Sequence, residues 1–150
     1  MAKDNPREHL AFLIHDVAKR LRLEFGRRVA HDDLMPSQAR CLVSLSFRPG
    51  ASLKALASVL EVQSMSVLRV VDELEQRKLL RREADPADRR ALRLFLTKAG
   101  EAKVRRIWSV LDDIVEESCA GMSTSSRREL SRSLMSLSAG MQVFGEDTRR

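Results

Sequence analysis

Residues 52–97 read SLKALASVLEVQSMSVLRVVDELEQRKLLRREADPADRRALRLFLT, and their pattern indicates the fold class. Its first part predicts two short helices, at about 53–60 and 63–78, because apolar residues recur there at steps of three and four. Ser52 is suited to cap the first helix, and a tight turn at Glu61 joins it to the second. Two short helices joined in this way form a helix-turn-helix candidate.

The pattern then changes from the helical period to the alternation of a strand. Leu92, Leu94 and Leu96 alternate with other residues, and residues 80–84 are also expected to be extended. The polar, charged segment 85–90 lies between them, so the two strands form a hairpin with a long tip. Because the hairpin follows a helix-turn-helix, the expected fold class is mainly α with a small β-hairpin (α+β), a winged helix-turn-helix.

Long helices are expected on both sides of this lobe. Residues 8–30 carry an apolar stripe, and two further helices are expected after the hairpin. The last has apolar residues spaced four and three apart, at Leu130, Leu134, Leu137, Met141 and Phe144. Such stripes fit packing within one chain or between two copies, and we favour the second. We expect one subunit, with a winged-helix lobe at about 35–97 and dimerisation helices at about 8–30 and 98–145.

Composition limits the classes of function. The 150 residues are 43% hydrophobic and 32% charged, which supplies a core and excludes a disordered chain. The 27 Lys and Arg against 21 Asp and Glu give a net charge of +6, which favours an anionic partner such as nucleic acid. No apolar run approaches the roughly 20 residues of a membrane span. The first residues, MAKDNPREHL, lack a signal-peptide core, so we expect a cytoplasmic protein with no membrane partner.

Motifs of catalysis and metal binding are absent from the sequence. It has no phosphate-binding glycine loop and no Gly-x-Ser-x-Gly motif, so we expect no enzyme activity and no cofactor. Cys41 and Cys119 are far apart and fit no zinc spacing, and the three histidines form no metal-binding pair. We therefore expect two reduced thiols and no metal.

Together these elements resemble the MarR (multiple antibiotic resistance regulator) family of transcription factors, and the resemblance covers nearly the whole chain. It is carried by PSQARCLVSL (36–45), SLKALASVLEV (52–62), VLRVVDELEQRKLLRR (67–82) and DPADRRALRLFLTKAGE (85–101). It implies a homodimer with two winged lobes that binds an inverted-repeat, palindromic operator in double-stranded DNA. It also implies a repressor that a small-molecule effector releases from DNA. In many family members this effector is aromatic or phenolic.

The resemblance assigns DNA contacts to the helix at about 63–78, whose leading end would face the bases in the major groove. The groups exposed there would be Gln63, Ser64, Met65, Ser66 and Arg69. The alternative is that Gln63 and Ser64 only cap the helix and that Arg69 is solvated. Ser52 and Lys54 open the preceding helix, whose N-terminus would approach a phosphate.

The resemblance also assigns contacts to the tip of the hairpin. Asp88 and Arg90 match the family's Asp-x-Arg pair, so Arg90 would enter the minor groove and Asp88 would orient its guanidinium. Arg89 lies beside them and would contact phosphate. The alternative is a solvated hairpin tip, where charged residues are common.

An effector site is less defined by the sequence. Cys41 and His15 are the candidates, because the first lies in an apolar helix and the second beside the apolar stripe of the first helix. The ordinary roles are a small buried hydrophobe for Cys41 and a surface or interface histidine for His15.

Four positions depart from the family's usual pattern. Met35 stands where Thr or Ser would cap a helix, and Leu68 stands where a small polar residue is usual. Glu61 and Lys78 occupy turns where Gly is common, which predicts a slightly different local backbone. Leu68 lies close to the expected DNA face and therefore leaves the operator sequence open.

Other functions remain compatible with the sequence. Met65 and Leu68 make the recognition helix more apolar than usual, which would suit a protein-interaction module built on the same dimer. A thiol-redox sensor acting through Cys41 is a second alternative. An activator or a nonspecific architectural protein is a third alternative. The sequence does not separate a repressor from an activator.

Overall fold

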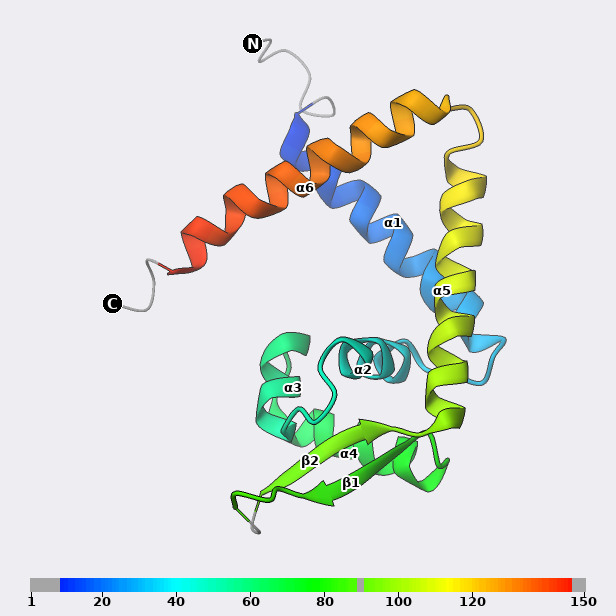
Figure 1. Ribbon diagram of the computed structural model, residues 1–150. Coiled ribbons are helices and arrows are strands. Elements are labelled where there is room, and N and C mark those ends of the chain that lie inside the picture. Colours follow the sequence, from blue (N-terminus) through cyan, green and yellow to red (C-terminus); the bar gives the residue numbers. More distant parts are fainter. Residues whose placement is uncertain (1–8, 89–90, 147–150) are drawn as a thin grey trace. The chain divides into compact units, whose positions relative to one another are not determined.

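The computed structural model describes residues 9–88 and 91–146, with side chains to residue 141 (Figure 1). Its elements are α1 (Leu10–Ala30), α2 (Pro36–Phe47), α3 (Leu53–Leu60), α4 (Ser64–Gln76), β1 (Leu80–Ala84), β2 (Leu92–Leu96), α5 (Lys98–Ser118) and α6 (Thr124–Glu146). The fold is mainly α with one antiparallel hairpin, as the sequence predicted. The chain divides into two compact units, Met1–Ile114 and Val115–Arg150.

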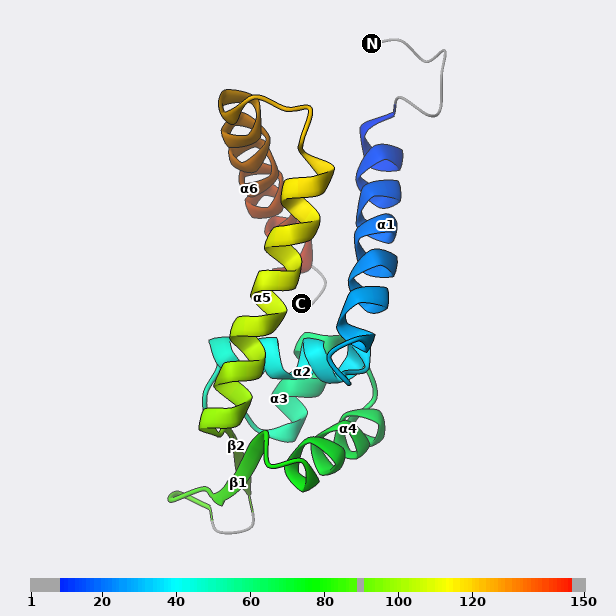
Figure 2. The same cartoon turned by 90° about the vertical axis from the view of Figure 1, so that its right-hand side faces the viewer.

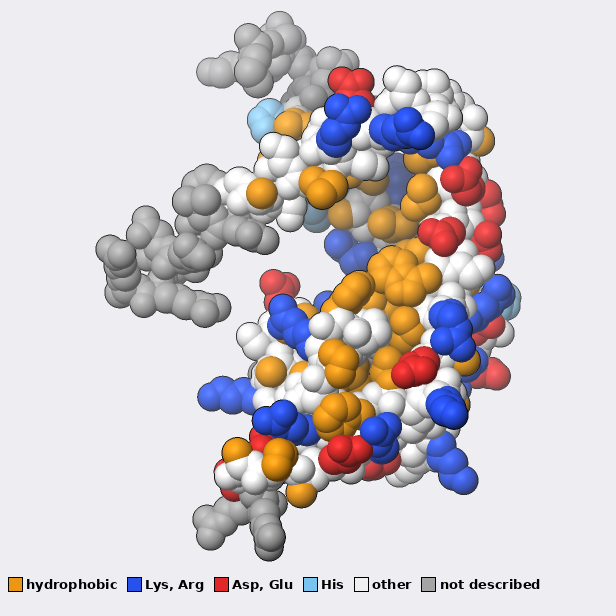
Figure 3. Space-filling view, viewed as in Figure 1, with side chains coloured by type: hydrophobic (Ala, Val, Ile, Leu, Met, Phe, Trp, Pro, Cys, Tyr) orange, Lys and Arg blue, Asp and Glu red, His pale blue; other side chains and the backbone are white. Residues whose placement is uncertain are grey.

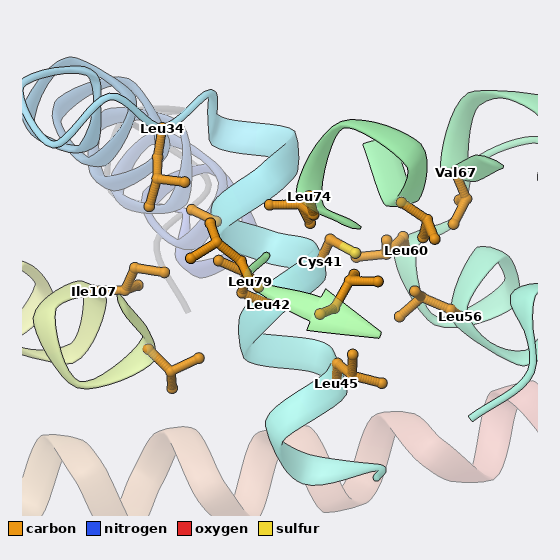
Figure 4. Close-up of a cluster of buried hydrophobic side chains, with 14 of the residues drawn as sticks. Leu34, Cys41, Leu42, Leu45, Leu56, Leu60, Val67, Leu74, Leu79 and Ile107 are labelled. Carbon is orange, nitrogen blue, oxygen red and sulfur yellow. The ribbon is translucent and has the colours of Figure 1, made fainter. Parts of the chain in front are cut away.

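The first unit contains the winged-helix lobe. Helices α2, α3 and α4 and the hairpin pack together around one apolar core (Figures 2 and 4). Burial of an aliphatic side chain contributes about 1.5–3 kcal/mol, so the core stabilises all these elements at once. Its fully buried side chains include Leu42, Leu45, Leu56, Val67, Val71, Leu74, Leu80, Leu94 and Ile107.

The hairpin is joined to the helices through its backbone. Its register pairs Leu80 with Leu96 and Arg82 with Leu94. On the other edge of β2, the N–H of Leu94 donates to the carbonyl of Ala51 at 3.0 Å, and Ala51 forms an isolated bridge with Leu94. The segment between α2 and α3 therefore holds the wing directly against the helix-turn-helix.

The start of α5 packs closely on Leu79, the residue that precedes β1. A Cβ added to Gly100 would lie 1.9 Å from the carbonyl oxygen of Leu79, so only glycine fits there. The hydroxyl of Thr97 accepts from the Gly100 N–H at 3.1 Å and donates to the carbonyl of Lys78 at 2.6 Å. Thr97 thus caps α5, as expected, and also ties α5 to the end of α4.

Three described residues other than glycine take the left-handed conformation, namely Asp33 in the turn after α1, with φ 56°, and two residues at positions where glycine is common. Glu61, which ends α3, has φ 55° and ψ 40°, and Lys78, after α4, has φ 58°. The expectation of a different local backbone at these residues was wrong. The backbone keeps the conformation that glycine favours, and Glu61 and Lys78 adopt it at a conformational cost.

The apolar stripe of α1 is exposed. Within α1 only Val29 is buried, and α1 lies in the first unit. The exposed large side chains are Leu10, Phe12, Leu13, Val17, Leu21 and Leu23. The first unit therefore leaves this stripe exposed.

The second unit contains the end of α5 and all of α6. Arg127 donates to Glu116 at 2.7 Å and to the carbonyl of Cys119 at 2.7 Å, which satisfies a carbonyl at the end of α5. Leu130, Leu134 and Met141 of the expected seam are exposed. The side chain of Phe144, the last member of that seam, lies outside the described residues.

The described residues offer neither a membrane-spanning helix nor a metal-binding cluster. None of their helices is long and apolar enough to cross a membrane. Within residues 9–88 and 91–146, no group of three His, Cys, Asp or Glu residues is placed to hold a metal ion.

Candidate nucleic-acid interface

The leading end of α4 is polar and exposed. Gln63 is the residue before the helix, and its side chain makes no capping hydrogen bond, so the simple capping role does not hold for it. Val67 and Val71 are buried on the opposite side of α4. The exposed side chains are those expected from the sequence, namely Gln63, Ser64, Met65, Ser66 and Arg69.

The N-terminus of α3 offers a second exposed group of donors. The hydroxyl of Ser52 accepts from the N–H of Ala55 at 3.1 Å, so Ser52 is a cap as expected. Lys54 is exposed in the first turn of the helix. A helix N-terminus with a nearby lysine favours a phosphate oxygen.

The hairpin tip is described only in part. Arg89 and Arg90 lie outside the described residues, so the expected Asp88–Arg90 pair stays a prediction. Asp88 is exposed, and its carbonyl accepts from the N–H of Ala91 at 2.9 Å.

The base of the tip is closed by an ion pair that sequence reasoning missed. Arg93 Nε donates to Asp85 Oδ2 at 2.7 Å, and the N–H of Ala87 donates to Asp85 Oδ1 at 2.8 Å. The hydrogen bond from Arg93 is the main reason that the pKa of Asp85 lies below its usual value. The only signal in the sequence was that the two residues flank the tip at the expected strand ends.

A second missed cluster joins the wing to α4. The guanidinium of Arg82, on β1, donates to Asp72 and Glu75, both on α4. Burial alone would lower the pKa of Arg82, but the hydrogen bond that Arg82 donates to Asp72 and the charge of Glu75 raise it above its ordinary value. Helix α4 and the hairpin are thereby connected by charged hydrogen bonds as well as by the core.

The two effector candidates lie in different surroundings. Cys41 of α2 is fully buried, and burial raises the pKa of its thiol to about 12. His15 is exposed on α1. A buried thiol of high pKa is a poor nucleophile, so the surroundings of Cys41 disfavour a redox role.

An exposed aromatic pair was not expected from the sequence. Phe47, at the end of α2, and Trp108, on α5, meet edge to face with ring centroids 6.0 Å apart and an interplanar angle of 80°. Their exposed fractions are 68% and 41%. Hydrophobic side chains gather along α5 in Figure 3, whereas Lys and Arg side chains surround the lobe.

Comparison with known proteins gives one family. The MarR family model matches residues 34–92, which span α2 to the start of β2. A protein of Thauera aromatica, named for regulation of transcription of the hcr operon, is 32% identical over 85 residues. These are 56% of this chain and 51% of that protein, so the chain spans about half the length of this relative.

Solved structures extend the likeness to nearly the whole fold. A mutant MarR of Escherichia coli has a TM-score of 0.81 at 22% identity, over 89% of this chain and 98% of that one. MepR of Staphylococcus aureus has a TM-score of 0.73 at 18% identity, over 88% and 98%. Another structure of MarR, at 26% identity, has a TM-score of 0.74 over 95% and 97%. The match over residues 34–92 and the shared fold agree, and both relate this chain to the MarR family.

Proposed function

We propose that this chain is a DNA-binding transcriptional regulator that acts as a homodimer and represses transcription from an inverted-repeat operator. One observation carries the proposal. The leading end of α4 presents Gln63, Ser64, Ser66 and Arg69 to solvent, whereas Val67 is buried behind them. An α-helix fits the major groove, and these side chains match the hydrogen-bonding groups of base edges.

Other features support a DNA partner. Lys54 at the start of α3 and the arginines of the wing segment supply positive charge on either side of α4 in the sequence, and the net charge is +6. The relative from Thauera aromatica is named for transcriptional regulation. The proposed contacts are Ser52, Lys54, Gln63, Ser64, Met65, Ser66, Arg69, Asp88, Arg89 and Arg90.

The homodimer is supported by the apolar surface that one chain leaves exposed. Leu13, Val17 and Leu21 on α1 are exposed along one stripe, and Leu130 and Leu134 on α6 are exposed as well. Large exposed apolar stripes of this kind are typical of subunit interfaces. We assign α1, α5 and α6 to the interface and residues 35–97 to the DNA-binding lobe, in a cytoplasmic protein.

A small aromatic effector is part of the proposal. The exposed Phe47–Trp108 pair offers ring faces and edges for a planar ligand, which His15 and Cys41 do not. Trp108 is the only tryptophan in the chain, so its fluorescence reports on this site alone. Quenching by phenolic compounds that also release DNA would support this assignment, and release without quenching would contradict it.

The first experiment is a binding assay with DNA from just upstream of the coding region and with random DNA, at two salt concentrations. We expect a selective complex of one dimer per site that weakens steeply as salt rises, because lysines and arginines displace counterions. Equal, weak binding to both DNAs would contradict sequence-specific regulation from that site. Retained dimerisation together with such a result would favour the protein-interaction alternative, for which the exposed Met65 is the supporting observation.

A further inference from the structure

Gln38 is the only polar side chain that is buried among the described residues. It lies on α2 and is 6% exposed. Its carboxamide oxygen accepts from the N–H of Met35 at 3.0 Å and from Arg77 Nη1 at 3.2 Å. Its nitrogen donates to Glu73 Oε2 at 2.9 Å. Because two of these partners are donors and the third is a carboxylate, only one orientation of the amide satisfies all three.

Glu73 links the buried amide of Gln38 to the surface of α4. One carboxylate oxygen accepts from the buried Gln38, and the other, Oε1, accepts from Arg69 Nε at 3.2 Å. The side chain of Glu73 is 39% exposed and that of Arg69 is 85% exposed. A continuous path of hydrogen bonds therefore runs from the core of the lobe to an arginine on the exposed side of α4.

The path matters because Arg69 and Glu73 alone form a weak pair. An exposed ion pair four residues apart on a helix stabilises less than the rotamer entropy of one ordered arginine costs. Gln38 restricts the rotamers of Glu73 from below, so that Glu73 offers Arg69 a fixed acceptor. The contact uses Nε, which is one of five N–H donors of the guanidinium.

We propose that Gln38 is a positioning residue that sets the base selectivity of α4 by holding Glu73 and, through it, Arg69. The inference rests on the proposed function, in which α4 enters the major groove. Bidentate recognition of a base needs an aligned guanidinium, whereas a freely rotating one contacts any phosphate. Gln38 itself does not contact DNA.

The variant that tests this most sharply is Gln38→Glu. It keeps an oxygen for Met35 and Arg77 and replaces only the NH2 group that faces Glu73 with a second oxygen. At pH 8 two carboxylates then face each other and Glu73 is displaced. We expect the preference for a selected duplex over a shuffled one to fall about tenfold, within the range of one base contact.

The reciprocal double variant tests the mechanism. In Gln38→Glu with Glu73→Gln, the amide of residue 73 donates to residue 38 and its oxygen accepts from Arg69. We expect this swap to restore most of the preference. Gln76→Glu is the matched control, because it adds the same charge at an exposed position on α4 and has no part in the path.

The measurement is binding of each variant to a duplex that the wild-type protein selects from a random-sequence library, together with the shuffled duplex and a thermal melt. Arg69→Ala is combined with Gln38→Glu in a double-mutant cycle. If Gln38 acts through Arg69, we expect Gln38→Glu to cause no further loss of preference in a protein that already carries Arg69→Ala. If Gln38→Glu does not fold, Glu73→Ala enters the same cycle and is expected to give the same loss.

Three results would overturn the inference. The first is an unchanged preference in folded Gln38→Glu, and the second is no recovery of preference in the double variant Gln38→Glu with Glu73→Gln. The third is a loss in Gln38→Glu with Arg69→Ala that equals the product of the two single-variant losses. Failure of the proposed function looks different. In that case the wild-type protein selects no duplex at all, and the inference about base selectivity fails together with the proposed function.

Discussion

Arg93 and Asp85 form an ion pair of 2.7 Å that joins the two sides of the wing below its tip. Asp85 directly follows β1, and Arg93 lies within β2. The contact therefore fixes the separation of the strand ends at the base of the tip, and it provides the first test.

The ion pair predicts a pH effect of definite sign. Because the pKa of Asp85 is lowered, its contribution to stability is present above the unfolded value of about 3.9 and is lost as pH falls through the folded value. Carbon NMR titration of Asp85 should show this lowered pKa in the wild type. In Arg93→Ala the pKa should rise toward the ordinary value, and an unchanged pKa would mean that the pair does not form in solution.

Arg90→Ala tests the wing. We expect it to lose about tenfold or more of the operator affinity with the dimer intact, because a guanidinium in a narrow minor groove gains from its negative potential. Gel-shift titration measures the affinity and sedimentation measures the dimer. Arg105→Ala, which removes an exposed arginine from α5, is the control. Equal affinities of Arg90→Ala and the wild type would show that the assignment is wrong.

The left-handed turns predict two stabilising substitutions. Glu61→Gly and Lys78→Gly each remove the steric cost of φ near 55–58° and should add about 0.5–1 kcal/mol to the free energy of unfolding. Urea denaturation measures the change. Lys54→Gly, inside α3, should instead lose about 1 kcal/mol. A loss at residue 78 as large as that at residue 54 would contradict the turn geometry.

The close packing at Gly100 predicts that adding a methyl group there strongly destabilises the fold. Gly100→Ala would place a Cβ 1.9 Å from the carbonyl oxygen of Leu79, so α5 or β1 must shift, and we expect a loss of about 2–3 kcal/mol or more. Gly140→Ala is the matched control, because nothing lies within 4 Å of its added Cβ and alanine favours a helix. Thermal melting of both variants decides the point, and similar melting temperatures would refute the close contact.

The two cysteines should differ in reactivity. Burial raises the pKa of Cys41 to about 12, whereas Cys119 is partly exposed at the end of α5. We expect iodoacetamide to label Cys119 well before Cys41 in the native protein and both at similar rates in urea, as measured by mass spectrometry. Fast native labelling of Cys41 would revive the thiol-redox alternative.

The periodic features of the fold could be predicted from sequence. The helix-turn-helix, both strands and the caps Ser52 and Thr97 depend on neighbours within four residues, so local patterns report them. The bounds of β2, 92–96, follow from leucines at every second position, and residues 80–84 were expected to be extended on the other side of the polar tip. The exposed end of α4 was predictable for the same reason, since it is the polar side of one helix.

The contacts that order the site could not be read in this way. Gln38 and Glu73 are far apart in sequence, and neither residue type signals a buried hydrogen bond. Phe47 and Trp108 likewise meet only because α2 and α5 pack in the folded chain. The conformations of Glu61 and Lys78 were misjudged because the tertiary structure imposes a turn that local preference opposes.

The bridge between Ala51 and Leu94 has a consequence for engineering. It fixes β2 to the helix-turn-helix from one edge, while the Asp85–Arg93 pair closes the hairpin from the other side. Residues 86–92 therefore start and end at anchored positions and form a replaceable cassette. Exchanging that cassette for one of different length or charge would retune recognition of the DNA flanks, and the lobe that carries α4 would keep its structure.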